Sequence, residues 1–168
     1  AAHSTGISDS AVLAGVIGND EGDLAQRPFN DTAIERGIFR KTNLLRKNRS
    51  VKELSYSDKL AQAAQAHSRD MAVNDYTGHQ YQNGPTIENR YGWFGIHCSR
   101  QGELVLYVRF DEVLDSKSIE AISQRVVEGW LTSKSHEAVL VNGSWRTSGI
   151  GVSQDFNKGI YVTMTLCG

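Results

Sequence analysis

The sequence predicts an α+β domain in which helices come first along the chain and antiparallel strands come last. Two observations favour this class. Apolar residues recur at helical spacing between residues 32 and 77, and two runs rich in β-forming residues, 145–152 and 160–166, flank a short turn near the end. Helices followed by such strands are typical of a sheet covered by helices. With 168 residues, of which 39% are hydrophobic, the chain is long enough to bury one core.

Charge and composition set limits on the partners. The 18 Lys and Arg residues nearly balance the 19 Asp and Glu residues. Without a basic excess, we expect no nucleic-acid partner. Since no apolar run reaches the length of about 20 residues that a membrane-spanning helix needs, we also expect no transmembrane segment. The chain begins with Ala1 and not with Met, which allows but does not show a mature chain from which a signal peptide was removed; an extracellular location is our expectation.

The first part of the chain, residues 1–34, is predicted to be an N-terminal extension to one domain over residues 35–168. Ser, Gly, Asp and Asn are frequent in the extension and periodicity is weak, apart from an apolar run at 11–17 that can dock on the domain. A first helix is expected from near Thr32 to Asn48, because apolar side chains there form a stripe among Arg and Lys.

The second helix has the clearest local pattern. Ser57 is a good N-cap residue. Four residues of the inner face then recur at helical spacing: Leu60, Ala64, His67 and Met71. Gly78 ends the run and His79 follows it directly. Because His67 lies on the apolar stripe, we interpret it as a core histidine and not as a ligand.

The later elements follow from caps, β-forming residues and turn residues. Thr86 can cap a short helix, and residues 103–108 form an apolar, β-rich run that predicts a strand. Residues 118–131 are helical by their period, with apolar side chains on the inner face. The two final strands are joined by residues 155–159, whose composition is typical of a hairpin turn.

The two cysteines, Cys98 and Cys167, allow two interpretations. A disulfide would close a loop of about 70 residues and stabilise the domain by about 4 kcal/mol in the chain-entropy model. Two buried free thiols would instead act as small apolar side chains. An oxidising compartment, which secretion implies, favours the disulfide.

Three side chains are candidates for a functional site: His79, Glu103 and His136. Each lies near the end of a periodic segment, so they converge only if those segments pack side by side. Two neutral imidazoles and a carboxylate can hold zinc or another divalent cation, and three protein ligands leave one coordination position open. We therefore predict a metal-capable cleft formed by His79, His136 and Glu103.

Several short segments, in their order and spacing, resemble the CAP superfamily, which contains cysteine-rich secretory proteins, antigen 5 and pathogenesis-related proteins. The matching segments are 54–72, Gly78-His79, Gly102-Glu103-Leu104, 126–136, 148–152 and 160–163. The form is the shorter one found in bacterial and some fungal members. The resemblance covers residues 36–168, so the predicted domain at 35–168 is interpreted as a CAP domain. It implies a three-layer α/β/α sandwich with a central antiparallel sheet, and a cleft that binds zinc in some members.

The chain also departs from the family pattern. Ser133 stands where many members have a second glutamate; Glu128 and Glu137 are the nearest acidic residues, and neither matches the motif. The spacer 110–118 is an insertion relative to compact members. An alternative alignment would use Glu88 as the strand glutamate, but it leaves Gly102-Glu103 without an explanation.

These features predict a secreted CAP-domain protein that binds a lipid, sterol or cell-surface component, with a cleft able to hold a divalent metal. The alternative is a metal-dependent hydrolase that uses the same cleft, in which a metal-bound water is activated by Glu103. A purely structural domain with an empty cleft is a third possibility. Since the sequence contains no Gly-X-Ser-X-Gly elbow and no Ser-His-Asp or Cys-His signature, we expect a binding protein and not an enzyme.

Overall fold

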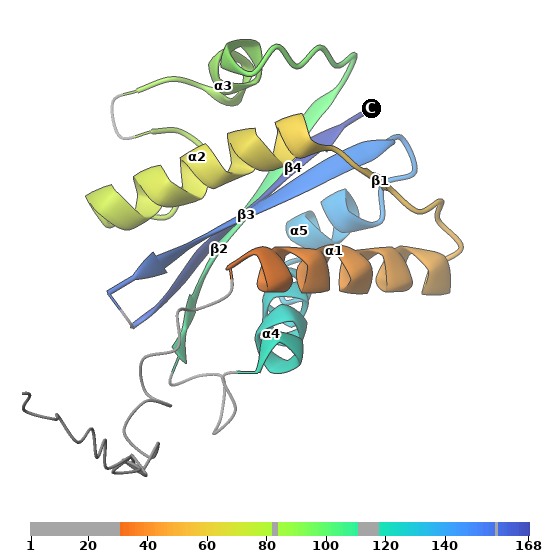
Figure 1. Ribbon diagram of the computed structural model, residues 1–168. Coiled ribbons are helices and arrows are strands. Elements are labelled where there is room, and N and C mark those ends of the chain that lie inside the picture. Colours follow the sequence, from red (N-terminus) through yellow and green to blue (C-terminus); the bar gives the residue numbers. More distant parts are fainter. Residues whose placement is uncertain (1–30, 82–83, 111–117, 157) are drawn as a thin grey trace, which may run out of the picture.

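A computed structural model describes residues 31–81, 84–110, 118–156 and 158–168 (Figure 1). Its elements are α1 (Asp31–Asn48), β1 (Ser55–Tyr56), α2 (Asp58–Asn74), α3 (Ile87–Trp93), β2 (Gln101–Arg109), α4 (Ile119–Leu131), α5 (Lys134–Leu140), β3 (Thr147–Asp155) and β4 (Gly159–Cys167). The predicted α+β class is confirmed. Most of the predicted extension at 1–34 and of the predicted insertion at 110–118 lies outside the described residues, so both stay predictions.

The sheet has four strands in the order β1-β3-β4-β2. The three long strands are antiparallel, with β4 in the middle: Thr165 pairs with Gly149 of β3 on one side and with Glu103 of β2 on the other. The two-residue strand β1, which the sequence did not predict, pairs with β3 in parallel. The predicted antiparallel sheet is thus confirmed for its long strands, and β1 adds a short parallel edge.

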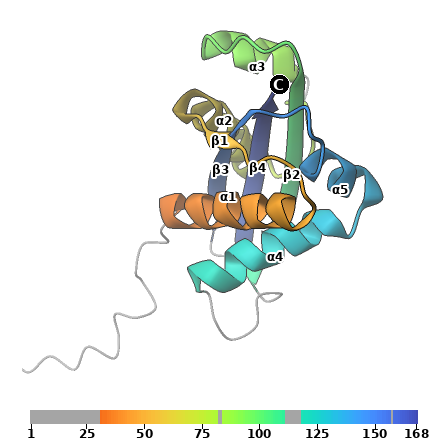
Figure 2. The ribbon, with the colours of Figure 1, turned by 90° about the vertical axis from the view of Figure 1, so that its right-hand side faces the viewer.

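Side chains of the middle strand point alternately to two helical layers. On one face, Ile160, Val162 and Met164 join the main core with residues of α1 and α4. On the other face, Tyr161 packs against Met71 of α2. Figure 2 shows α1, α4 and α5 together, apart from α2 and α3. The result is the expected three-layer α/β/α sandwich.

Helix α2 packs unusually close to β3 because β3 has glycines beneath it. A Cβ atom added at Gly149 would lie 2.0 Å from the backbone nitrogen of Ala61, and one at Gly151 would lie 2.2 Å from that of Gln65. Ser68 uses this proximity: its hydroxyl donates to the Gly151 carbonyl oxygen at 2.8 Å. The close contact fixes α2, and with it the chain that leaves the end of α2.

The predicted helix starts are confirmed. Ser57 accepts a hydrogen bond from the backbone N–H of Leu60, and Ser118 accepts one from that of Ala121. Thr86 and Asn89 form a reciprocal capping box at the start of α3. Helix α2 ends slightly earlier than predicted, because Asp75 adopts a left-handed conformation with φ of 52°.

Arg46, in the last turn of α1, is buried and ties three segments together. Its Nε donates to the Lys52 carbonyl oxygen at 2.9 Å. Its Nη1 donates to the carbonyl oxygens of Leu140 at 2.7 Å and Asn142 at 3.0 Å, at the end of α5. Burial lowers the pKa of Arg46, and the charge of Arg146 lowers it further. Three backbone carbonyls therefore compensate a cation that has lost its water.

The disulfide between Cys98 and Cys167 is present, so that prediction is confirmed. It joins the segment after α3 to the end of β4. A small cluster that includes Tyr91 and Ile96 packs beside it. The hydroxyl of Tyr91 accepts a hydrogen bond from the Leu166 backbone N–H at 3.0 Å. The Tyr91 hydroxyl and the disulfide next to α3 thus help to hold this helix to the sheet.

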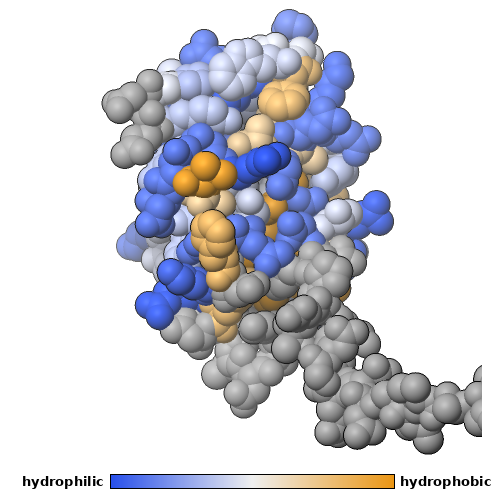
Figure 3. Space-filling view, turned by 60° about the vertical axis from the view of Figure 1, so that its left-hand side comes forward, coloured by the Kyte–Doolittle hydropathy of each residue, from blue (hydrophilic) through white to orange (hydrophobic). Residues whose placement is uncertain are grey.

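The surface is mostly hydrophilic on the face that Figure 3 shows. Hydrophobic side chains form small spots there among hydrophilic ones. Large hydrophobic side chains exposed in the described part of the chain come from different elements, for example Val73 of α2 and Trp93 of α3. Isolated apolar side chains are normal on a protein surface, so each needs a further argument before a function is assigned to it.

Candidate functional site

The candidate site is built around the end of α2 and the start of β2. The chain leaves α2 at Asp75 and reaches His79 after Gly78. The His79 side chain is 57% exposed, whereas that of Glu103, on β2, is 2% exposed. The His79 Nδ1 lies 3.2 Å from the Glu103 Oε1, within hydrogen-bond distance. Two of the three predicted residues are therefore in direct contact.

Glu103 is also paired with a buried cation. The guanidinium of Arg90, on α3, donates from Nη2 to the Glu103 Oε2, and its side chain is fully buried. Arg90 Nη1 also donates to the carbonyl oxygen of His79 at 3.0 Å. Arg90 thus holds both the carboxylate and the backbone of the histidine that contacts it. The hydrogen bonds of the Arg90 Nη atoms offset part of the cost of burying this ion pair.

His67 also holds the loop that contains Gly78 and His79. Its Nε2 lies 2.7 Å from the carbonyl oxygen of Gly78, which can only accept, so Nε2 carries the proton. The same Nε2 lies 3.7 Å from Glu103 Oε1. Burial lowers the pKa of His67, which keeps the ring neutral. The sequence-based interpretation of His67 as a core histidine is consistent with its full burial, and the structure adds a role in holding Gly78.

Tyr81 completes the support. Its ring stacks on that of His67, with centroids 5.3 Å apart and planes 17° apart. The guanidinium carbon of Arg90 lies 5.3 Å from the centre of the Tyr81 ring, in a cation–π arrangement. The ring of the exposed Trp93 lies 6.2 Å from that of Tyr81. Aromatic rings therefore extend from the buried His67 outward to the surface at Trp93.

His136 lies on the short helix α5, which follows α4 after Ser133. Partial burial lowers the pKa of His136, and the nearby His79 lowers it further. The charge of His79 thus affects His136, and the site formed by both histidines stays a prediction. His136 makes no hydrogen bond or ion pair with Glu103 among those found in the described part of the chain.

The acidic residues nearest to Ser133, where many family members have a glutamate, have partners outside the candidate site. Glu137 forms an ion pair with Arg49 at 2.8 Å, and Glu128 accepts a hydrogen bond from the Gln124 side chain at 2.7 Å. Glu88, of the rejected alignment, is exposed on α3. Within residues 31–81, 84–110, 118–156 and 158–168, no three His, Cys, Asp or Glu side chains are grouped to hold a metal ion.

Sequence patterns did not single out Arg90, His67 or Tyr81 as site residues. Arg90 belongs to a seven-residue helix and reads as part of a solvated face. No local signal marked Arg90 as a site residue, because its partner Glu103 lies 13 positions away along the chain.

The structure is thus an α/β/α sandwich in which His79, after α2, contacts Glu103 of β2. The model of the cysteine-rich secretory protein family, CAP, matches residues 39–166. This match covers most of the chain, and the protein therefore belongs to the CAP family.

Three known proteins illustrate the similarity. The Bacillus subtilis (strain 168) membrane protein YlbC is 26% identical over 125 residues, which are 74% of this chain and 33% of YlbC. The structure of an extracellular protein containing an SCP domain from Bacillus anthracis has a TM-score of 0.68 and 23% identity, over 82% of this chain and 41% of that one. The structure of NaASP2 with Zn²⁺ has a TM-score of 0.56 and 10% identity, over 84% of this chain and 83% of NaASP2.

The chain spans 33% of YlbC and 41% of the Bacillus anthracis chain, so it corresponds to one part of these longer proteins. At identities of 23% and 10%, the two solved structures establish a common fold. Among the described helices, none combines the length and the apolar character that crossing a bilayer requires.

Proposed function

We propose that this CAP domain is an extracellular recognition domain that binds a lipid, sterol or cell-surface component, and that its cleft holds a divalent cation, such as zinc, through His79 and His136. The observation that carries the metal part is the contact of 3.2 Å between His79 Nδ1 and Glu103 Oε1. NaASP2, which shares the fold, was solved with Zn²⁺. The Bacillus anthracis protein with the same fold is described as extracellular.

The contact with Glu103 selects the nitrogen that His79 offers. A carboxylate accepts the proton on Nδ1 and leaves Nε2 with its lone pair free. Metal-binding histidines commonly have such a carboxylate behind them, which fixes the ring and strengthens the ligand. The His79 side chain is 57% exposed, so a cation can reach it from solvent. Glu103, which we expected to bind the metal directly, is better suited to orient His79.

The donor set fits an exchangeable cation. Arg90 compensates the charge of Glu103, so the imidazoles of His79 and His136 are the ligands that we propose. Zinc usually takes four ligands, and two protein ligands leave two positions to water or to a bound molecule. The hydrolase alternative has less support, because the Glu103 side chain is 2% exposed and faces Arg90 and His79, which leaves a metal-bound water little access to it.

Trp93 supports the recognition part of the proposal. Its side chain is among the exposed large hydrophobic ones, at 62%, and its ring lies 6.2 Å from that of Tyr81 beside the His79 loop. Tryptophan is common in binding surfaces because it has a large apolar body and a polar N–H group. A ligand with an apolar part can therefore contact Trp93 while its polar part faces the cleft.

A cobalt or zinc titration of the purified domain tests the metal part. We expect His79→Ala and His136→Ala each to weaken binding by about 100-fold, and Glu103→Gln to weaken it by about 10- to 100-fold, since Glu103 acts through His79. His97→Ala is the matched control, because His97 is exposed beside Cys98 and should leave the affinity unchanged. Wild-type affinity in His79→Ala would refute the metal site.

Vesicle binding tests the recognition part. The domain is mixed with lipid vesicles, with and without sterol, and Trp93→Ala is expected to reduce binding at least several-fold. Phe156→Ala is the control, because Phe156 is also an aromatic side chain and is 89% exposed at the turn between β3 and β4. An equal loss of vesicle binding in both variants would indicate non-specific hydrophobic binding and would contradict a specific surface at Trp93.

A further inference from the structure

The edge of the sheet opposite Glu103 is open along most of β3. β3 lies between β1 and β4, but β1 pairs only with Thr147 and Ser148. From Gly149 to Asp155, β3 has no strand on that side in the part of the chain that the structure describes. An edge strand presents backbone donors and acceptors at which another strand can pair.

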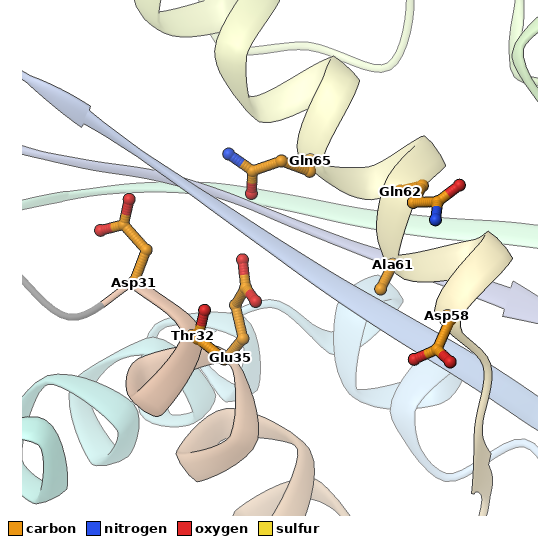
Figure 4. A pocket seen from close by; sticks show the side chains of 7 residues that line it. All are labelled: Asp31, Thr32, Glu35, Asp58, Ala61, Gln62 and Gln65. Atoms are coloured by element: carbon orange, nitrogen blue, oxygen red, sulfur yellow. The ribbon is translucent and has the colours of Figure 1, made fainter.

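A groove of about 530 Å³ runs beside this open edge, between the first turns of α1 and the first half of α2 (Figure 4). Its lining residues are Asp31, Thr32, Glu35, Asp58, Ala61, Gln62 and Gln65. Figure 4 shows Asp31 and Glu35 reaching from α1 and Gln65 from α2 toward the strand between them. Among the residues that the structure describes, the lining contains three carboxylates, two amides and no basic side chain. Its polarity is that of a site for a polar or cationic guest.

Side chains occupy the place of a missing strand at one backbone group of β3. The N–H of Val152 points into the groove, where Gln65 Oε1 lies 2.9 Å away and Glu35 Oε1 lies 3.1 Å away. One N–H thus donates to two oxygen atoms, so either oxygen could be withdrawn and the N–H would keep a partner. A backbone carbonyl from a guest strand could take over this hydrogen bond and release both side chains.

The carboxylates of the groove have no basic partner among the described residues. Neither Asp31, Glu35 nor Asp58 belongs to an ion pair there. Burial raises the pKa of Glu35 to about 7, and the charge of Asp31 adds to this effect. Burial also raises the pKa of Asp31. A cation placed here would stabilise the ionised carboxylates and so offset the free-energy cost of burying their charge.

The other charged groups around Glu35 come from three elements. Asp31 lies on the same helix, Asp58 starts α2, and the hydroxyl of Tyr56 on β1 has its own pKa raised by burial and by Glu35 and Asp58. The charge of Arg36 acts in the opposite direction and lowers the pKa of Tyr56. Arg36 is exposed and is not part of the groove lining, so the groove itself stays acidic.

We propose that this groove binds an extended peptide segment with basic side chains, which adds as a strand to β3 and pairs with it at Val152. Backbone hydrogen bonds supply the register, and the carboxylates of α1 and α2 select Lys or Arg. The site is distinct from the His79 cleft, because β2 and β3 lie on opposite sides of β4. The two proposals therefore succeed or fail independently.

The test is an NMR titration of the full chain with a capped peptide of about seven residues that alternates Lys and Val, a length that matches 149–155 at about 3.3 Å per residue. We expect the largest shifts at 149–155. A Glu-Val peptide and a Lys-Val peptide with methylated backbone nitrogens are each expected to bind at least 10-fold more weakly. Equal binding of the methylated peptide would overturn strand addition. An absence of shifts at 149–155 would overturn the site.

Variants separate the groove from the cleft. Asp31→Asn and Glu35→Gln should each weaken the Lys-Val peptide several-fold, whereas Glu53→Gln, an exposed acidic residue outside the groove, should not. His79→Ala should leave peptide binding unchanged. If Glu53→Gln and Glu35→Gln have equal effects, the attraction is one of overall charge and the proposal is wrong.

Peptide binding should also depend on pH in a defined direction. The cation favours the ionised carboxyl group, and the pKa of Glu35 is about 7 before binding. Affinity should therefore rise from pH 6 to pH 8, by several-fold, and this rise should disappear in Glu35→Gln. An identical rise in Glu35→Gln would contradict the assigned role of Glu35.

Discussion

Glu103 shows how one buried carboxylate organises a site. Its side chain is 2% exposed, and its two oxygens are shared among Arg90 and His79. Removing a charge from water costs free energy. The Arg90 guanidinium, which is buried beside the carboxylate, offsets part of this cost. The exposed His79 is then held in place by groups that never contact solvent. Stability and site geometry therefore depend on the same ion pair.

This dependence predicts a large effect of Arg90→Met. The change leaves the Glu103 carboxylate buried without a cation, so we expect a loss of about 3–5 kcal/mol in the free energy of unfolding, measured with urea. The double variant Arg90→Met with Glu103→Met should recover part of that loss, because it removes both charges.

Arg49→Met is the matched control for this measurement. Arg49 pairs with Glu137 at 2.8 Å, but its side chain is 51% exposed, and solvent-exposed pairs contribute about 0–1 kcal/mol. A small effect at both arginines would show that the Arg90 pair does not hold the fold together.

Among single residues, His79, His136 and Glu103 were predicted from the sequence, but the residues that hold them in place were not. His79 and Glu103 were predicted from their positions at the ends of a helix and a strand, and the structure brings them into contact. Arg90 and His67 could not be predicted as supports, because their partners lie 11 or more positions away along the chain. A buried cation on a short helix resembles a solvated one until the tertiary contacts are known.

At the scale of elements, the packing of α2 on β3 decides where the loop with His79 begins. The pair Gly149 and Gly151 lets the helix backbone approach the strand. Along the open edge of the same strand, the helix and α1 frame the groove. One helix therefore positions both proposed surfaces.

Gly151→Ala tests this packing. The added methyl carbon would lie 2.2 Å from the backbone nitrogen of Gln65, and backbone cannot rotate away as a side chain can. We expect a loss of about 2–3 kcal/mol or more in the free energy of unfolding, or an insoluble product. Gly143→Ala is the control, since a methyl carbon added there would meet nothing within 4 Å. Equal stability of both variants would contradict the proposed close packing.

The elements were predicted unequally well. Long amphipathic helices with a Ser or Thr cap, such as α2 and α4, have a periodic signal over several turns, and both were predicted. The seven-residue α5 and the two-residue β1 were not, because neither is long enough to show a period. Helix α5 carries His136, so the weakest local signal lies at a predicted site residue.

At the scale of the whole molecule, the Cys98–Cys167 bond joins residues 69 positions apart and secures α3, the helix that carries Arg90. Replacing both cysteines with Ser should lower the free energy of unfolding by about 4 kcal/mol, because the unfolded chain is no longer constrained. Urea unfolding with and without a reductant measures this. The reductant should destabilise the wild type and leave the variant unchanged; equal stability of all four samples would contradict the expectation.

The class and the sandwich were predictable from the order of periodic segments and from the family resemblance. The order of strands was not, since pairing β4 between β2 and β3 depends on contacts between distant segments. The groove could not be predicted either, because Asp31 and Asp58 meet only when helices from opposite faces reach the same edge. Hydrophobic periodicity along the chain indicates which face of a helix or strand is buried, whereas the edge of a sheet is known only once the strand order is known.

The burial of Arg46 has a consequence for how the chain is made. The acceptors of its Nη1 lie 94 and 96 positions later, at Leu140 and Asn142. During synthesis from the N-terminus, the first helix emerges with this cation and must wait for most of the polypeptide before it can lose its water. Contacts this distant slow folding. We therefore expect the domain to acquire its native packing only after translation has passed Asn142, a delay during which a chaperone can still bind the unfolded chain.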